Sequence, residues 1–184
     1  MRLCLLAIIC AAPVQTFAAE IQRVSVNYKD GQFYMAMDVL LDTTPERAFT
    51  VMTNYTALGK INDAVEQSQL LKTFSTLKHR VKTITVVCVL WICEKITQVQ
   101  DMVKNPQTLQ LHAELTADSP DFESGHAEWH FSAHPKGTRM IFNSVIEPSF
   151  WIPPLIGTWA VSRMLTAHAK ITSSGLEREA GKLP

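Results

Sequence analysis

The stretch that decides the fold is residues 33–49, which read FYMAMDVLLDTTPERAF. Its first half alternates, because large apolar side chains occupy every second position: Phe33, Met35, Met37, Val39 and Leu41. This period of two predicts a β-strand with one fully apolar face.

The second half of the stretch carries the signals of a helix start. Thr44 can cap a helix, Pro45 suits the first helical position, and Glu46 complements the positive end of the helix dipole. Ala48 and Phe49 then begin the buried side. We expect this helix to end near residue 54 and a second short helical turn to reach about residue 61.

The chain on either side of this stretch reads mainly as strands. Residues 20–28 alternate, and the turn at 29–32 has Asp-Gly at its centre, which is a strong hairpin signal. Downstream, alternating segments separated by turns predict a long meander with an acidic loop at 118–125: 64–72, 76–88, 93–102, 109–115, 127–131 and 138–147.

The period changes after residue 148. Two prolines at 153–154 fit only the first turn of a helix. From Leu155, apolar residues at helical spacing predict a long helix to about Glu179, weakened slightly by Gly157 and Gly175. No repeat or linker divides the chain, so the pattern predicts one mostly antiparallel α+β domain.

The N-terminus has the features of an export signal. Arg2 precedes an apolar run from Leu3 to Val14, and small residues follow at 18–19. The run is shorter than the roughly 20 helical residues that span a bilayer. We therefore expect residues 1–18 to be a signal peptide and 19–184 to be the mature domain in an oxidising compartment such as a bacterial periplasm. The alternative is an uncleaved anchor helix.

The mature chain would keep two cysteines, Cys88 and Cys93. In a straight strand, residues five apart lie about 16 Å apart on opposite faces, too far to bond. If residues 89–92 form a four-residue hairpin loop, the two cysteines face each other and can form a disulfide, which an oxidising compartment favours. Two thiols are too few for a zinc site, and their spacing is not that of a redox catalyst.

Composition and polar residues exclude several function classes. The formal net charge is +0, which argues against a nucleic-acid partner.

Two histidines and a glutamate, His126, Glu128 and His130, share one face of a strand and could bind zinc. They lie opposite the apolar face of that strand, so we expect a solvated surface and no metal. His79 and Asp38 could act as acid or base if buried, although a structural role is commoner. We predict no catalytic residue and no cofactor.

The order of these elements resembles the START-like superfamily, the polyketide cyclase and lipid-transport group also called SRPBCC. The resemblance rests on residues 41–49 (LDTTPERAF) with Thr53-Asn54-Tyr55, on 125–129 (GHAEW), on 137–140 (GTRM), and on the terminal helix from Phe150. The coenzyme-Q-binding branch is the nearest. The resemblance implies a helix-grip fold: a curved antiparallel sheet wrapped around a long C-terminal helix, with two short helices after the second strand.

The resemblance also implies a cavity for a hydrophobic ligand between sheet and helix. The residues alone favour an ordinary filled core, and only the resemblance favours a cavity. We expect these residues to bind the ligand: Phe33, Met35, Met37, Leu77, His79, Leu109, Leu111, Trp129, Phe131, Phe142, Trp159 and Met164.

The expected partner is a lipid, quinone or isoprenoid-like molecule. The apolar residues 90–91 and 150–154 could make transient contact with a membrane surface, or they could pack as a gate over the cavity. Two other functions stay open: an aromatase/cyclase-like enzyme, and an interaction module without a ligand.

Overall fold

The structure, a computed structural model, describes residues 19–89, 92–150 and 157–184. The deciding stretch folds as the sequence predicts, into a strand, β2 (Gln32–Leu41), that leads into a helix, α1 (Pro45–Met52). The Arg47 backbone N–H donates to Thr44 Oγ1 across 3.4 Å, so Thr44 is the N-cap. A short 3-10 helix, η1 (Leu58–Lys60), follows and matches the expected second turn.

The remaining elements are strands and one long helix: β1 (Glu20–Lys29), β3 (Val65–Thr73), β4 (Lys78–Val89), β5 (Ile92–Asn105), β6 (Gln110–Leu115), β7 (Phe122–His134), β8 (Gly137–Pro148) and α2 (Gly157–Ala180). The strands form one eight-stranded antiparallel sheet in the order β1-β2-β8-β7-β6-β5-β4-β3. β1 and β3 are its two edges.

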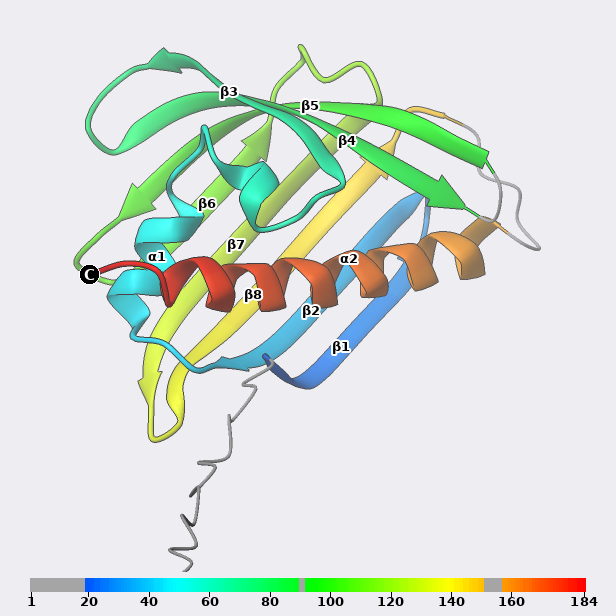
Figure 1. The fold of residues 1–184 in the computed structure, drawn as a ribbon. Coiled ribbons are helices and arrows are strands. Elements are labelled where there is room, and N and C mark those ends of the chain that lie inside the picture. The colour runs from blue at the N-terminus through cyan, green and yellow to red at the C-terminus, as the bar shows by residue number, and fades with distance from the viewer. Residues whose placement is uncertain (1–18, 90–91, 151–156) are drawn as a thin grey trace, which may run out of the picture.

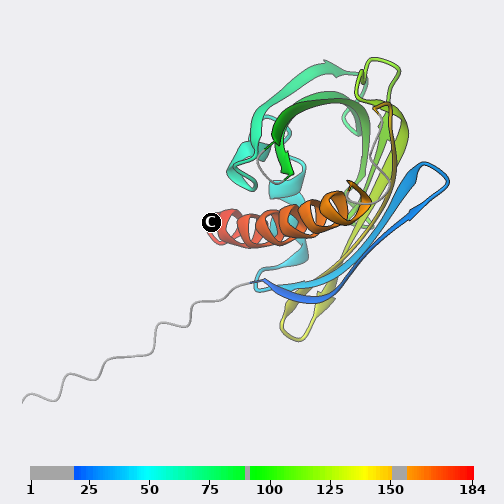
Figure 2. The same ribbon diagram turned by 90° about the vertical axis from the view of Figure 1, so that its right-hand side faces the viewer.

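The sheet curves around α2. Figure 1 shows α2 crossing in front of the strands, and Figure 2 shows β3, β4 and β5 arching over it. The predicted fold class, a curved antiparallel sheet wrapped around a C-terminal helix with two short helices after β2, is confirmed. Within the described ranges, no helix is long and apolar enough to cross a membrane.

The filled part of the core lies where α1 and the C-terminal half of α2 meet the sheet. Val39 and Leu41 of β2 are fully buried there, as is Leu176 of α2. Phe49 of α1 packs edge-to-face on Phe131 of β7, with ring centroids 6.1 Å apart. These contacts fill one end of the molecule and leave the space under the N-terminal half of α2 for the site described below.

The C-terminal end of α2 is held against the chain around η1. A Cβ placed on Gly175 would overlap the carbonyl oxygen of Ile61, so only glycine permits this approach. The Arg178 guanidinium donates to the carbonyl of Lys60 across 2.6 Å. Gly175, which the sequence suggests is a weakness of the helix, is therefore a packing requirement.

Two predicted boundaries differ from the structure. The β4–β5 loop has two residues, 90–91, instead of four, because residues 89 and 92 still pair. β7 begins at Phe122 because the loop before it is shorter than expected. That loop is also tied down, since Ser119 Oγ accepts from Val99 N and donates to Val99 O, each at 2.9 Å. Leu155, the predicted start of the last helix, lies outside the described residues, as does the predicted signal peptide.

Candidate functional site

Two adjoining cavities lie between the concave face of the sheet and α2. Their volumes are about 600 Å³ and about 280 Å³. Six residues line both cavities. They come from the segment after η1, from four strands and from α2: Asn62, Val65, Thr85, Gln98, Ile146 and Leu165. Volumes of this size match the usual range for small-molecule sites.

One wall of the cavities is apolar. Met35, Trp129 and Phe142 project from the central strands β2, β7 and β8 into the smaller cavity, and the Trp129 and Phe142 rings are 4.9 Å apart. Phe33 and Met164 line the larger one. This wall offers aromatic and methionine surface to an apolar ligand.

The opposite wall is polar. Thr83 and Thr85 from β4, with Gln98 and Gln100 from β5, line the smaller cavity, and Thr85 and Gln98 also line the larger one. Sequence reasoning missed these four residues. A usable signal existed, because Thr83 and Thr85 continue the period-two face that begins with Leu77, His79 and Val81.

A buried hydrogen-bond network stands where η1, β3 and α2 meet. Asn62 is only 7% exposed. Its Oδ1 accepts from the backbone N–H of Ala64 at 3.0 Å, which fixes the amide so that Nδ2 donates. Nδ2 lies 2.9 Å from Thr172 Oγ1 and 3.4 Å from His168 Nδ1.

This network sets the tautomer and the protonation state of His168. An amide that donates to Nδ1 requires a lone pair there, so the imidazole is neutral with its proton on Nε2. Burial lowers the pKa of His168, and the nearby Asp63 opposes that effect only in part. His168 lines the larger cavity, and among the described residues its Nε2–H has no protein acceptor. It can therefore donate to a ligand.

The structure brings together five of the predicted ligand-binding residues in these cavities: Phe33, Met35, Trp129, Phe142 and Met164. Met37, Leu111 and Phe131 are buried in the filled core, and Leu109 packs against it. Leu77 and Trp159 are 43% and 57% exposed and line neither cavity.

His79 also lies outside the cavity lining. Its ring is 5.5 Å from that of Tyr55, and neither His79 Nδ1 nor Tyr55 Oη, both buried, has a hydrogen-bond partner among the described residues. Burial, with the charge of Lys104, lowers the pKa of His79, and burial raises the pKa of Tyr55 to about 12. The pair belongs to the packing beside α1 rather than to the ligand site.

The other candidate acid or base, Asp38, is occupied in an ion pair. Arg139 Nη2 lies 2.6 Å from Asp38 Oδ2, and its hydrogen bonding holds the pKa of Asp38 below the usual range. Arg139 is about half exposed, so the pair contributes little to stability.

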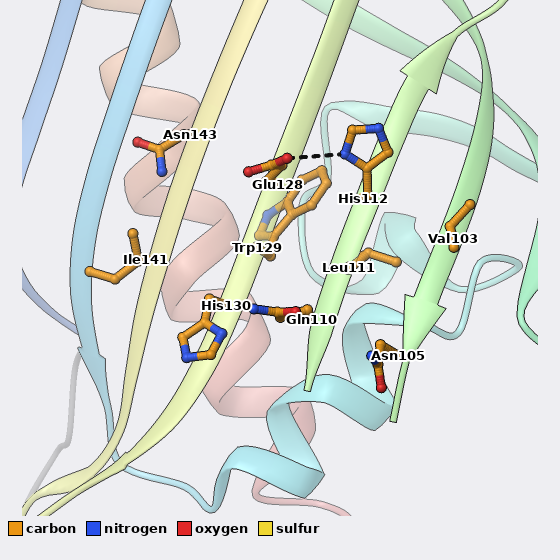
Figure 3. Close-up of a pocket in the computed structure, with 10 residues that line it drawn as sticks. All are labelled: Val103, Asn105, Gln110, Leu111, His112, Glu128, Trp129, His130, Ile141 and Asn143. Carbon is orange, nitrogen blue, oxygen red and sulfur yellow. Dashed lines mark ion pairs between the residues drawn. The ribbon is translucent and has the colours of Figure 1, made fainter. Parts of the chain in front are cut away.

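The outer face of the sheet carries the histidine cluster. A groove of about 310 Å³ lies on this face. Figure 3 shows the residues that line it, with α2 on the far side of the sheet. His112 Nδ1 lies 3.3 Å from Glu128 Oε1, and His126, Glu128 and His130 are exposed as predicted. In the described part of the chain, no three His, Cys, Asp or Glu side chains are arranged to hold a metal.

The cysteines form a disulfide at the end of the β4–β5 hairpin. Cys88 and Cys93 are paired in register with a Cα–Cα distance of 4.0 Å, and both are exposed. Their neighbours Val87 and Glu94 line the larger cavity. The disulfide therefore joins the two strands that form one rim of the site.

Comparisons with known proteins find similarity to solved structures. No protein-family model and no curated protein matches the chain. Similar structures include the Zhui aromatase/cyclase from Streptomyces sp. R1128, at 10% identity and a TM-score of 0.69, covering 82% of this chain and 94% of that one. They also include a STAR-related lipid transfer protein from Xanthomonas axonopodis, at 12% identity and a TM-score of 0.62, covering 86% and 99%.

A START superfamily protein from Mycobacterium smegmatis aligns with a TM-score of 0.60 at 10% identity, over 83% of this chain and 99% of that one. Identities this low establish the fold alone, and the coenzyme-Q-binding branch stays a prediction. The chain has the helix-grip fold of the START-like superfamily.

Proposed function

We propose that this chain is an exported carrier that holds one hydrophobic small molecule, such as a lipid, quinone or isoprenoid, between the sheet and α2. The observation that carries the proposal is the cavity of about 600 Å³ with an apolar wall and one oriented donor, His168. Apolar surface removed from water supplies the affinity, at about 25 cal/mol per Å².

The polar wall indicates the kind of head group. A neutral His168 donates from Nε2 but brings no positive charge, and Thr85 and Gln98 are also neutral. Lys95 also lines the larger cavity, but its ammonium group is held by Glu66 across 2.6 Å. A carbonyl, hydroxyl or ester oxygen fits these donors better than a bare carboxylate or phosphate, which needs a cationic partner when buried. The expected ligand is thus a long apolar body with an uncharged oxygen function.

Export is part of the proposal. It is supported by the signal-like residues 1–18 and by the disulfide, which persists in an oxidising compartment. A periplasmic carrier would meet its ligand at a membrane surface. The segments predicted for that contact are 90–91 and 150–154. Of these only Phe150 lies among the described residues, and it is exposed and lines the larger cavity.

An aromatase/cyclase-like enzyme is the second candidate, because several similar structures are aromatase/cyclases and His168 is a titratable group in the cavity wall. The substitution His168→Ala distinguishes the two functions. A carrier keeps capturing ligand with this substitution, at reduced affinity, and turns over no polyketide. An enzyme binds its substrate but loses turnover.

The test is uptake of a fluorescent fatty-acid or quinone analogue by the delipidated mature protein. Leu165 lines both cavities, whereas Ala167, two residues along α2, is exposed. Leu165→Trp should block uptake, and Ala167→Trp, which adds the same side chain outside, should not. No uptake by the wild type would favour the interaction module without a ligand. Equal uptake by both variants would show that the analogue binds outside the two cavities and would contradict the proposal.

A further inference from the structure

The turn between β3 and β4 exposes an unusual number of apolar side chains. We call residues 70–78 the β3–β4 tip. Four large apolar residues within it are 42–49% exposed: Leu70, Leu71, Phe74 and Leu77. β3 is an edge strand, so no further strand lies beyond it. Isolated exposed leucines are ordinary, but a cluster on one projecting turn marks a contact surface.

The same segment is strongly basic. Between Glu66 and Glu94 the sequence has no carboxylate but four cationic side chains: Lys72, Lys78, Arg80 and Lys82. Arg80 lies 2.7 Å from Asp101 and 3.5 Å from Asp118, and Asp101 also lies 3.5 Å from Lys78. Among the described residues, Lys72 and Lys82 have no carboxylate partner.

The cationic groups gather around the exposed aromatic ring. Lys72 Nζ lies 4.8 Å and Lys78 Nζ 5.3 Å from the centroid of Phe74, and Arg80 Cζ lies 5.5 Å from it. An apolar ring and leucines bordered by lysines on long stems form an amphipathic surface, in which the apolar groups can enter the acyl boundary while the ammonium groups stay among head groups.

We propose that the β3–β4 tip docks on a bilayer surface carrying anionic lipids. The charge is complementary to such a surface, and each basic residue near it adds attraction. A stable protein interface generally buries about 20–30 residues on each side, many more than the four apolar side chains of this tip. A shallow insertion into lipid needs no such area.

The docking surface is separate from the ligand site. The tip is at the end of β4 opposite to the β4–β5 turn, whose strands line the larger cavity, and the 12 residues of β4 span roughly 40 Å. Figure 1 shows the two turns at opposite ends of β4. Vesicle binding therefore does not require a loaded cavity, and it can fail or succeed independently of the proposed carrier function.

The experiment is co-sedimentation of the mature chain with vesicles of phosphatidylcholine, with and without one quarter phosphatidylglycerol. We expect binding only to the anionic vesicles and loss of binding at high salt. Lys72→Gln and Lys78→Gln should each weaken binding about fivefold. The double variant L71S/F74S should lose binding to the anionic vesicles.

Two substitutions elsewhere are matched controls: Ile171→Ser on α2 and Lys29→Gln at the β1–β2 turn. Both should bind as the wild type does, and circular dichroism checks that every variant folds.

Four results would overturn the proposal. They are no binding to anionic vesicles, equal binding to neutral vesicles, undiminished binding by L71S/F74S, and weakened binding by the controls. Sedimentation of the free protein adds one more arm: a dimer that L71S/F74S converts to monomer would show that the tip contacts a second copy of the chain instead of lipid.

Discussion

Asn62 Nδ2 and His168 Nδ1 lie 3.4 Å apart, and this contact joins the segment after η1 to the middle of α2 across 106 positions of sequence. Because the amide must donate, it holds His168 neutral and leaves its Nε2–H for the cavity. The relationship gives the cavity its one oriented donor.

Asn62→Asp should reverse the protonation of His168. A carboxylate at this position favours a proton on Nδ1, so the pKa of His168 should rise from below 6.5 to above it. Titration of the His168 ring protons by NMR measures this change. Asn27→Asp, on an exposed strand residue, is the control and should leave His168 unaltered. An unchanged pKa in Asn62→Asp would contradict the assigned hydrogen bond.

Gly175→Ala should destabilise the fold even though alanine favours helices by about 1 kcal/mol over glycine. The new Cβ would collide with the Ile61 carbonyl, and we expect a net loss of about 1–3 kcal/mol in the free energy of unfolding. Urea unfolding measures it. Ser174→Ala, on the exposed neighbour, should be neutral or slightly stabilising. A stabilised Gly175→Ala would disprove the close approach.

Glu177 should make stability fall as pH rises above 4.5 and through its folded-state pKa. Its Oε1 accepts from the Asp42 N–H at 3.0 Å, but Oε2 is buried without a partner, and burial raises the pKa of Glu177 above 4.5. A raised folded-state pKa contributes stability below pH 4.5 that is lost as pH rises through the folded-state value.

Glu177→Gln should remove that decline, so the variant gains stability relative to the wild type between pH 5 and pH 8. Thermal unfolding at the two pH values measures the gain. Glu179 is the control, because Lys182 donates to it and lowers its pKa. Glu179→Gln should not flatten this decline, and an identical pH response from both variants would refute the role of Glu177.

Removing the disulfide should loosen the cavity rim. The closed loop is short, so Cys88→Ser with Cys93→Ser should lower the free energy of unfolding by roughly 2 kcal/mol. A reductant should destabilise the wild type by a similar amount and leave the double variant unchanged. Equal responses of the two proteins to reductant would mean that the thiols are not bonded.

The strand–helix stretch could be predicted because its signals are local. The alternation through Leu41 and the cap at Thr44 each act over a few residues, and both agree with the final fold. The facing cysteines were also predictable. The loop length was not, because it depends on how far strand pairing continues toward the turn, and residues 89 and 92 still pair.

The residues of the cavity wall were harder to predict. Alternation with a period of two identifies the side chains that share one face of a strand, but it does not show which other element covers that face. Leu77 shares a face with Thr83 and Thr85, yet it lies at a hairpin tip beyond the cover of α2 and is exposed. Trp159 is likewise exposed on α2. The contact of Asn62 with His168 leaves no local pattern, since it exists only when η1 and α2 meet.

The measurement that tests the carrier most directly is native mass spectrometry of the wild-type protein isolated from its own compartment. The account predicts a species heavier than the mature chain by one small apolar molecule, released by organic solvent and absent from Leu165→Trp but present in Ala167→Trp. Recovery of the wild type only at the mass of the bare chain, together with no uptake of any apolar analogue afterwards, would contradict it.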